Sequence, residues 1–365
     1  MILMTRTTIT RMATTMSVIG GIFFVGLAVL LCQSPTTTTS NNVVVVTAFT
    51  PTTTTTSTTF VPVMGRRRIH SHASSTTATA LATTASSSAT TENTPLPPPP
   101  PDMDDVGFVV LAGGTGSRMK ASMPKQYLPL KDTPVLHYSL DLFLERLGEY
   151  CLSQNTKPPK YVVLVMDPLY QDQYRNVLLS GPYKERFSIA SPGVERQGSV
   201  ENGVKALVEL SNGQCQYVAI HDSARPLVTI QEICNVVRDA KEHGAAVLGV
   251  PCKATIKESN DGTFVQRTIP RSRLWEVHTP QVIKVETLLR GFEKVEAENL
   301  EVTDDVSIVE ALEEPVKLTL GEYTNLKITT PEDMDVATAI LNDRSDGGRV
   351  SKIFDSIEPV ASRKA

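Results

Sequence analysis

The amino-acid sequence predicts an α/β fold with a mainly parallel central sheet over residues 105–345. Short apolar runs alternate there with runs of helical spacing, which is the pattern of strands joined by crossover helices. A glycine-rich turn directly follows the first apolar run, and a polar pattern over 253–275 interrupts the alternation. Ligands of parallel sheets bind beyond the carboxyl ends of the strands, so functional residues are expected there.

The strands and helices follow from these runs in chain order. The expected strands are short, apolar and bounded by polar or turn residues: Val106–Leu111, Tyr161–Met166, Tyr217–His221, Ala245–Val250 and Val316–Thr319. The expected helices have apolar residues on one face: Val135–Leu147, Ser199–Leu210, Ile230–Ala240, Val285–Val295 and Glu332–Leu341. The connections between parallel strands are expected to be right-handed.

The segment 253–275 predicts a protruding β-arm. Ala254–Glu258 and Thr263–Thr268 are polar, β-branched runs, and the turn Ser259-Asn260-Asp261-Gly262 joins them. Neither run has a full apolar face, and a two-stranded hairpin alone is marginally stable in water. We therefore expect the arm to pack on another subunit.

Composition excludes several classes of protein. The chain has 365 residues and a formal net charge of −4, but residues 1–91 contain no Asp, Glu or Lys and only five Arg. The remainder therefore carries 30 − 39 = −9, which argues against sequence-independent nucleic-acid binding. The five cysteines have no CxxC spacing, which disfavours a zinc site or a disulfide framework.

The N-terminal region has the composition of targeting sequences. Ser17–Cys32 is uncharged and follows Arg6 and Arg11, as in a signal peptide, and a single-pass membrane anchor is the alternative. The Ser/Thr/Ala-rich segment that follows is typical of an organelle transit peptide, and the junction Val46–Pro51 resembles a cleavage motif before Phe49. The expected boundaries are a signal peptide over 1–48, a plastid transit peptide over 49–94, a Pro-rich linker over 95–104 and a flexible tail over 346–365. We expect delivery to the chloroplast stroma and no membrane segment in the mature form.

The glycine-rich turn Ala112–Gly116 indicates phosphate binding. Its glycines let backbone N–H groups approach a phosphate closely. Met119 stands where a dinucleotide fingerprint needs glycine, and the P-loop pattern is absent. Arg118 and Lys125 beside the turn suit a triphosphate whose pyrophosphate must leave. An ordinary strand–helix turn with surface basic residues is the alternative.

Acidic residues give two further candidates. Asp222 ends a predicted strand and could ligate a Mg²⁺ that bridges phosphates, or it could cap a helix. His221 is expected to be structural, because phosphoryl transfer needs no imidazole. Thr303–Asp305 is expected to be a helix N-terminus, where the helix dipole favours acidic residues.

Eight sequence blocks carry a family resemblance. In order they are LAGGTGSRM, SMPKQYLPL, GVERQGSVENG, HDSARPLV, GAAVLGVPCKATIKE, LWEVHTPQV, EVTDDVSIVE and NLKITTPEDM. Together they resemble the 2-C-methyl-D-erythritol 4-phosphate cytidylyltransferases, especially the plastid forms of the non-mevalonate isoprenoid pathway. The resemblance implies a homodimeric, Rossmann-like nucleotidyltransferase with a β-arm. It also implies CTP and 2-C-methyl-D-erythritol 4-phosphate as substrates, with Mg²⁺.

The resemblance also implies roles for individual residues. Catalytic roles fall on Arg118, Lys125 and Lys327. Nucleotide binding falls on Ala112, Gly113, Gly114, Gly193, Ser199 and the metal ligand Asp222. Binding of methylerythritol phosphate falls on Arg225, Thr255, Arg271 and Thr279.

Two positions depart from the family pattern, and other functions stay open. Pro270 stands where many relatives place an Asp before the arm's Arg271, and Val194 stands where some bacterial relatives have an Asp near the base. A ribitol 5-phosphate cytidylyltransferase would share the glycine-rich loop and the fold. A catalytically inactive dimeric scaffold, or a membrane-anchored transferase that keeps Ser17–Cys32, are the remaining alternatives.

Overall fold

The computed structural model describes residues 98–114, 117–119, 121–345 and 348–357. Contacts divide the chain into two units, 1–88 and 89–365, and all described residues lie in the second. The predicted signal and transit peptides lie outside the described residues. Within the described part, no helix combines the length and apolarity needed to cross a membrane.

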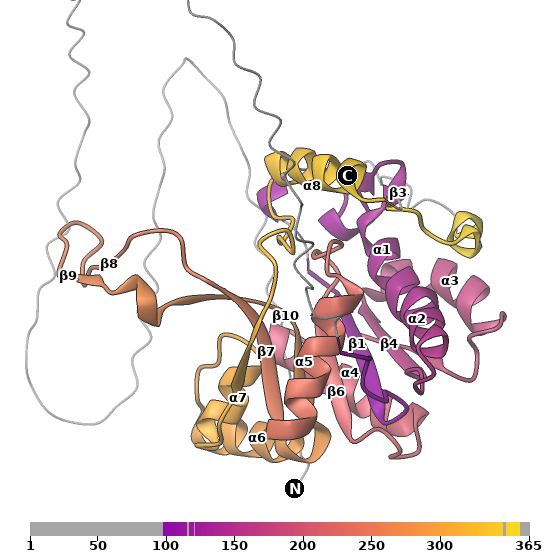
Figure 1. Ribbon diagram of the computed structural model, residues 1–365, viewed down its shortest axis with the longest axis horizontal. Coiled ribbons are helices and arrows are strands. Elements are labelled where there is room, and N and C mark those ends of the chain that lie inside the picture. The colour runs from indigo at the N-terminus through magenta and orange to yellow at the C-terminus, as the bar shows by residue number, and fades with distance from the viewer. Residues whose placement is uncertain (1–97, 115–116, 120, 346–347, 358–365) are drawn as a thin grey trace, which may run out of the picture. The chain divides into compact units, whose positions relative to one another are not determined.

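A seven-stranded sheet forms the centre of the described unit (Figure 1). Its strands, in spatial order, are β11 (Lys317–Leu320), β7 (Ala245–Pro251), β10 (Trp275–Lys284), β6 (Tyr217–Asp222), β1 (Val106–Ala112), β4 (Tyr161–Met166) and β5 (Phe187–Ala190). Only β10 runs antiparallel to its neighbours, so the prediction of a mainly parallel sheet is confirmed. The five predicted strands are present, whereas β5 and β10 were not predicted.

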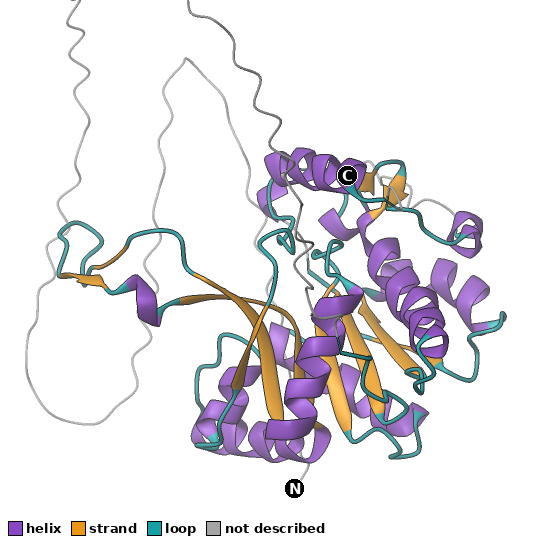
Figure 2. Ribbon diagram, viewed as in Figure 1, coloured by secondary structure: helices purple, strands orange, loops and turns teal. Residues whose placement is uncertain are grey.

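The helices cover both faces of this sheet (Figure 2). They are α1 (Val135–Asp141), α2 (Leu147–Ser153), α3 (Gln171–Tyr174), α4 (Arg196–Leu210), α5 (Ile230–His243), α6 (Val285–Glu298), α7 (Val306–Ala311) and α8 (Pro331–Asp343). A π-helical segment, Leu142–Arg146, joins α1 to α2, so the helix predicted over Val135–Leu147 is present and continues to Ser153. Helix α5 begins where Thr229 and Glu232 form a reciprocal capping box, and it ends at Gly244, whose φ is +91°.

Several shorter elements complete the unit. The strands β2 (Pro129–Leu130) and β3 (Thr133–Pro134) form a small antiparallel pair. The remaining single-turn elements are Ser117–Met119, Lys125–Tyr127, Pro168–Tyr170, Arg175–Leu179, Arg271–Arg273 and Lys352–Ser356.

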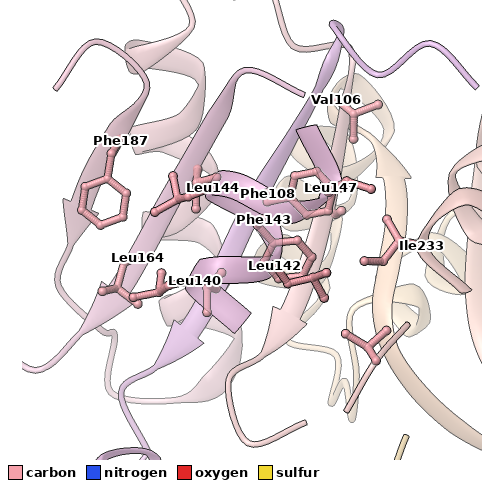
Figure 3. Packing of buried hydrophobic residues seen from close by; sticks show 14 of the residues in the cluster. Val106, Phe108, Leu140, Leu142, Phe143, Leu144, Leu147, Leu164, Phe187 and Ile233 are labelled. Atoms are coloured by element: carbon pink, nitrogen blue, oxygen red, sulfur yellow. The ribbon is translucent and has the colours of Figure 1, made fainter. Parts of the chain in front are cut away.

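Alternation along the strands sorts the core into two apolar layers. Phe108 on β1 points to the face covered by α1 and α5, and its ring stacks on Phe143 with centroids 4.5 Å apart (Figure 3). Val109, one residue later, points to the opposite face, where it packs with Val204 of α4. Both layers consist of buried apolar side chains, and such close-packed layers make the sheet a rigid platform for the residues at its strand ends.

The polar segment between β7 and β10 forms the predicted hairpin. Strands β8 (Ile256–Glu258) and β9 (Arg267–Ile269) pair antiparallel and extend from the ends of β7 and β10 (Figure 1). Both strands are shorter than predicted, and the turn between them is correspondingly longer. The Asp261 carboxylate organises this turn by accepting hydrogen bonds from two backbone N–H groups. The hairpin is exposed nearly throughout, and its role in dimerisation stays a prediction.

The ends of the described unit correct two expected boundaries. Met103 belongs to the expected Pro-rich linker, but its side chain is fully buried. Arg238 also donates a 2.8 Å hydrogen bond to the Pro99 carbonyl. The last part of this linker therefore packs on the domain. In the expected flexible tail, Phe354 is buried and the Ser351 N–H donates to the Asp141 carboxylate at 2.8 Å. The expectation of a flexible tail is therefore wrong for residues 350–357, because an apolar side chain anchors them.

Candidate active site

Two adjacent cavities open at the carboxyl ends of the central strands. The first, here called the loop cavity, measures about 530 Å³ and is lined by the glycine-rich turn, Lys125, Gln126 and the segment 192–196. The second, here called the Arg225 cavity, measures about 400 Å³ and is lined largely by residues of β10 and the 303–304 segment. Arg196, Asp222 and Lys327 line both cavities, so this charged group forms their common wall.

Gln126 fixes the conformation of the glycine-rich turn through two hydrogen bonds. The buried Gln126 amide donates hydrogen bonds to the Ala112 carbonyl at 2.6 Å and to the Gly114 carbonyl at 3.0 Å. A Cβ on Gly113 would lie 2.7 Å from the Pro192 Cβ, so a larger residue does not fit there. The predicted residues Ala112, Gly113 and Gly114 all line the loop cavity.

The opposite wall of the loop cavity comes from the GVERQGS block. The Gly193 N–H donates to the Ser199 hydroxyl at 3.0 Å, and this hydroxyl also contacts the Glu195 carbonyl at 3.1 Å. A Cβ on Gly193 would lie 2.6 Å from the backbone of Gly198, which leaves room for glycine alone. Both predicted residues of this block therefore reach the cavity, and Val194 beside them lines it with a fully exposed apolar side chain.

Asp222 ends β6 and lies between two cations. One carboxylate oxygen accepts from Lys327 Nζ at 2.5 Å, and the other accepts from Arg196 Nη2 at 3.3 Å. Burial alone would raise the pKa of Asp222, but the charges of Arg196 and Lys327 outweigh it and hold its pKa well below the usual range. The helix that follows is capped by Thr229, so the alternative of Asp222 as a helix cap is wrong.

Arg196 and Asp305 are site residues that the sequence did not reveal. The Arg196 guanidinium binds both oxygens of the buried Asp305 carboxylate and still reaches Asp222. Gln281 fixes this segment, because its side-chain oxygen accepts from the backbone N–H groups of Asp305 and Val306, each at 2.9 Å. Asp305 precedes α7, as expected for the Thr303–Asp305 segment, but it also anchors the common wall.

Lys125 lies at the edge of the loop cavity, half-buried, with both basic and acidic side chains near it. Its ammonium donates to the Ile328 carbonyl at 2.7 Å. Burial, reinforced by the charge of Lys327, lowers the pKa of Lys125 to about 8. The charge of Arg118 also lowers this pKa, although the Arg118 side chain is exposed and lines neither cavity.

The Arg225 cavity holds two of the predicted substrate-binding residues, Arg225 and Thr279. Arg225 is buried and donates to the Asn325 carbonyl at 2.6 Å, while its Nε finds no partner among the described residues. The Thr279 hydroxyl contacts the Asp222 N–H and His221 Nδ1, each at 3.1 Å. Burial lowers the pKa of His221 to about 4, so this histidine is a neutral structural link.

Thr255 and Arg271 lie apart from this group. Both are exposed on the hairpin segment and line neither cavity. The Arg271 guanidinium donates to the Lys253 carbonyl at 2.9 Å, a contact within the same segment. Within one chain, the other predicted residues line the two cavities, whereas Thr255, Arg271 and Arg118 line neither.

The donor set suits a phosphate-bound divalent cation better than a closed metal site. No group of three or more His, Cys, Asp or Glu side chains that could hold a metal occurs among the described residues. Mg²⁺ commonly keeps several waters and takes one or two carboxylates together with substrate phosphates. Asp222 supplies an ionised carboxylate at the common wall, so it fits such an ion.

Comparisons with known proteins agree with this geometry. Residues 106–343 match the family model described as "2-C-methyl-D-erythritol 4-phosphate cytidylyltransferase". The chain is 46% identical over 239 residues to the chloroplastic enzyme of that name from Oryza sativa subsp. japonica, covering 66% of this chain and 75% of the relative. It is 39% identical to the enzyme of that name from Desulforamulus reducens, covering 67% of this chain and 98% of the relative.

A solved structure is similar over the same region. It is described as 4-diphosphocytidyl-2C-methyl-D-erythritol synthase from Anaerococcus prevotii, and it matches with a TM-score of 0.55 and 25% identity. The match covers 66% of this chain and 99% of the solved one.

Proposed function

The chain belongs to the 2-C-methyl-D-erythritol 4-phosphate cytidylyltransferase family, and we propose that it transfers the cytidylyl group of CTP to 2-C-methyl-D-erythritol 4-phosphate. The products are 4-(cytidine 5'-diphospho)-2-C-methyl-D-erythritol and pyrophosphate. The reaction is a step of isoprenoid precursor synthesis. The observation that carries the proposal is the common wall of Arg196, Asp222 and Lys327 between the two cavities. A nucleotide in one cavity and a phosphorylated acceptor in the other would meet at this wall.

The loop cavity suits the nucleotide. The backbone of Ala112 and Gly113, together with Gly193 and Ser199, supplies hydrogen-bonding groups for the cytosine edge. Val194 brings no carboxylate to this cavity, so contacts that an Asp would make there are absent.

Cations surround the position where the triphosphate would react. Lys125 and Lys327 line the loop cavity, and Arg118 lies close enough for its charge to act on Lys125. An oxygen of the acceptor phosphate attacks the α-phosphorus in line, and the bond to pyrophosphate breaks, without a covalent enzyme intermediate. Positioning and cationic stabilisation of the developing charge therefore carry the rate.

Mg²⁺ is the proposed divalent cofactor, and Asp222 would hold it. When bound, the ion would neutralise phosphate charge and orient the triphosphate. Lys327 is more exposed than Asp222, so it can turn from the carboxylate towards a phosphate. Arg196 remains fixed by its two bonds to Asp305.

The acceptor would bind in the Arg225 cavity and against the arm of a second copy of the chain. Arg225 and Thr279 come from the same chain as the nucleotide site. Thr255 and Arg271, exposed on the hairpin, would complete the site of the partner subunit. This arrangement gives the exposed hairpin a function and makes the active form a homodimer.

A substrate matrix tests the activity. Purified protein is assayed for pyrophosphate release with CTP, UTP, ATP or GTP against methylerythritol 4-phosphate and ribitol 5-phosphate. We expect turnover with CTP and methylerythritol phosphate alone. A preference for ribitol 5-phosphate would show that the protein is a ribitol 5-phosphate cytidylyltransferase. No turnover with any pair of substrates, despite CTP binding, would favour the catalytically inactive scaffold.

We also propose delivery to the plastid stroma, which the chloroplastic rice relative supports. A fluorescent reporter fused after residue 100 should reach the stroma through the signal and transit segments. Phe49→Ala should stop the reporter short of the stroma, whereas Thr52→Ala serves as the control. Normal import of the Phe49→Ala fusion would show that the junction is not the cleavage motif.

A further inference from the structure

A third cavity, here called the C-terminal cavity, lies away from the proposed reaction centre. It measures about 460 Å³ and lies between the C-terminal segment 350–357 and the elements β2, β3, α1 and α3. None of its lining residues lines the loop cavity or the Arg225 cavity. Its volume is in the range of cavities that bind small organic molecules.

Four of the twelve residues that line this cavity have aromatic rings. Tyr127, Tyr174 and Phe354 line it together with His137, whose ring lies 5.4 Å from that of Phe354. His137 is neutral, since burial lowers its pKa to about 4, and its Nε2 lies 3.1 Å from the Tyr174 hydroxyl. The buried Tyr127 hydroxyl has no hydrogen-bond partner among the described residues. The cavity therefore offers aromatic faces, and one of its aromatic residues carries a polar atom without a partner among the described residues.

The charged groups at the cavity are all acidic. Asp132 and Asp355 line it and are exposed, so both carboxylates lie on its open side. No Lys or Arg is among its described lining residues, and neither carboxylate forms an ion pair in the described part of the chain. Anionic molecules, including both proposed substrates, are therefore disfavoured there. Aromatic faces beside carboxylates are instead the surroundings that attract an ammonium group.

We propose that the C-terminal cavity is a second binding site, specific for small organic amines with an apolar body. The apolar body packs among Tyr127, Tyr174 and Phe354, and the ammonium lies at the opening near Asp132 and Asp355. This site does not depend on the proposed transferase activity. One short turn, Lys125–Tyr127, connects it to the proposed active site, because Tyr127 lines the C-terminal cavity and Lys125 lines the loop cavity.

Three probes of matched shape and different charge test the site. Binding of 2-phenylethylamine, 2-phenylethanol and phenylacetate to the full-length chain is measured by calorimetry, with and without saturating CTP. We expect the amine to bind at least tenfold more tightly than the carboxylate, with the alcohol between them, and CTP to leave amine binding in place. Equal binding of amine and carboxylate, displacement of the amine by CTP, or no amine binding would each overturn the proposal.

Variants of the exposed carboxylates locate the probe. Asp132→Asn combined with Asp355→Asn should weaken amine binding at least fivefold and leave the alcohol unchanged. The matched control combines Asp335→Asn with Asp343→Asn, two exposed acids of α8 outside the cavity, and should bind like the wild type. Unchanged amine binding in the first pair would refute the site.

Discussion

The sheet edge and the hairpin between β7 and β10 are built in opposite ways. At the sheet edge, Asp222 is almost fully buried and both of its carboxylate oxygens are bonded to cations. On the hairpin, Thr255 and Arg271 are exposed and contact neither cavity. On the proposed assignment, one chain supplies the nucleotide site, whereas the acceptor site also takes Thr255 and Arg271 from the partner's hairpin. Four predictions test this division, from the largest expected effect to the smallest.

Loss of a cation at the sheet edge should have the largest effect. Lys125→Met removes positive charge from the position where the pyrophosphate leaves, and one such group in a water-poor site is worth about 100- to 1,000-fold in turnover. Steady-state kinetics should show kcat falling by this factor, with a smaller change in CTP binding. Lys294→Met on α6, at a half-buried lysine that lines neither cavity, is the control. A variant that binds CTP poorly but turns over normally at saturation would make Lys125 a docking group.

Mixing two inactive homodimers tests the hairpin. If Arg271 completes the partner's site, Arg271→Ala disables that site, whereas Lys125→Ala disables its own. At equal amounts and free exchange, half the dimers are mixed and each has one intact site, so about a quarter of wild-type activity should return. Exchange is followed with differently labelled subunits. No recovery despite exchange would place Arg271 in its own chain's site.

The pH dependence of the reaction tests the role of Lys125 at the sheet edge. Lys125 must be protonated to stabilise phosphate charge, and burial beside Lys327 lowers its pKa to about 8. Activity measured as kcat/KM for CTP should therefore be level below this pH and fall as pH rises through it, approaching about tenfold per unit. Lys125→Arg should be slower but should lose this fall, because arginine stays charged. A wild-type profile that stays level well above pH 9 would contradict the assignment.

The sequence predicts the parallel core well, because its strands are short, apolar and separated by amphipathic helices. It misses β10, whose first half is polar and which contains Pro280, a residue that usually argues against a central strand. Asp222 and Lys125 could be predicted from local motifs. The bond between Arg196 and Asp305 could not, because it joins residues 109 positions apart and only the packing of α7 brings them together.

The smallest effect is expected at the tip of the hairpin. Phe264 is 75% exposed, so Phe264→Ala should change the free energy of unfolding of the single chain by no more than about 0.5 kcal/mol. Phe143→Ala is the matched control, because the same truncation at a side chain that is 2% exposed should cost about 3–5 kcal/mol. Denaturant unfolding at low protein concentration measures both values. Analytical ultracentrifugation should show weaker dimerisation for Phe264→Ala alone, since the proposed interface would bury this ring in the partner. Equal destabilisation by the two variants would mean that the hairpin packs on its own chain, and the acceptor site would then need no second subunit.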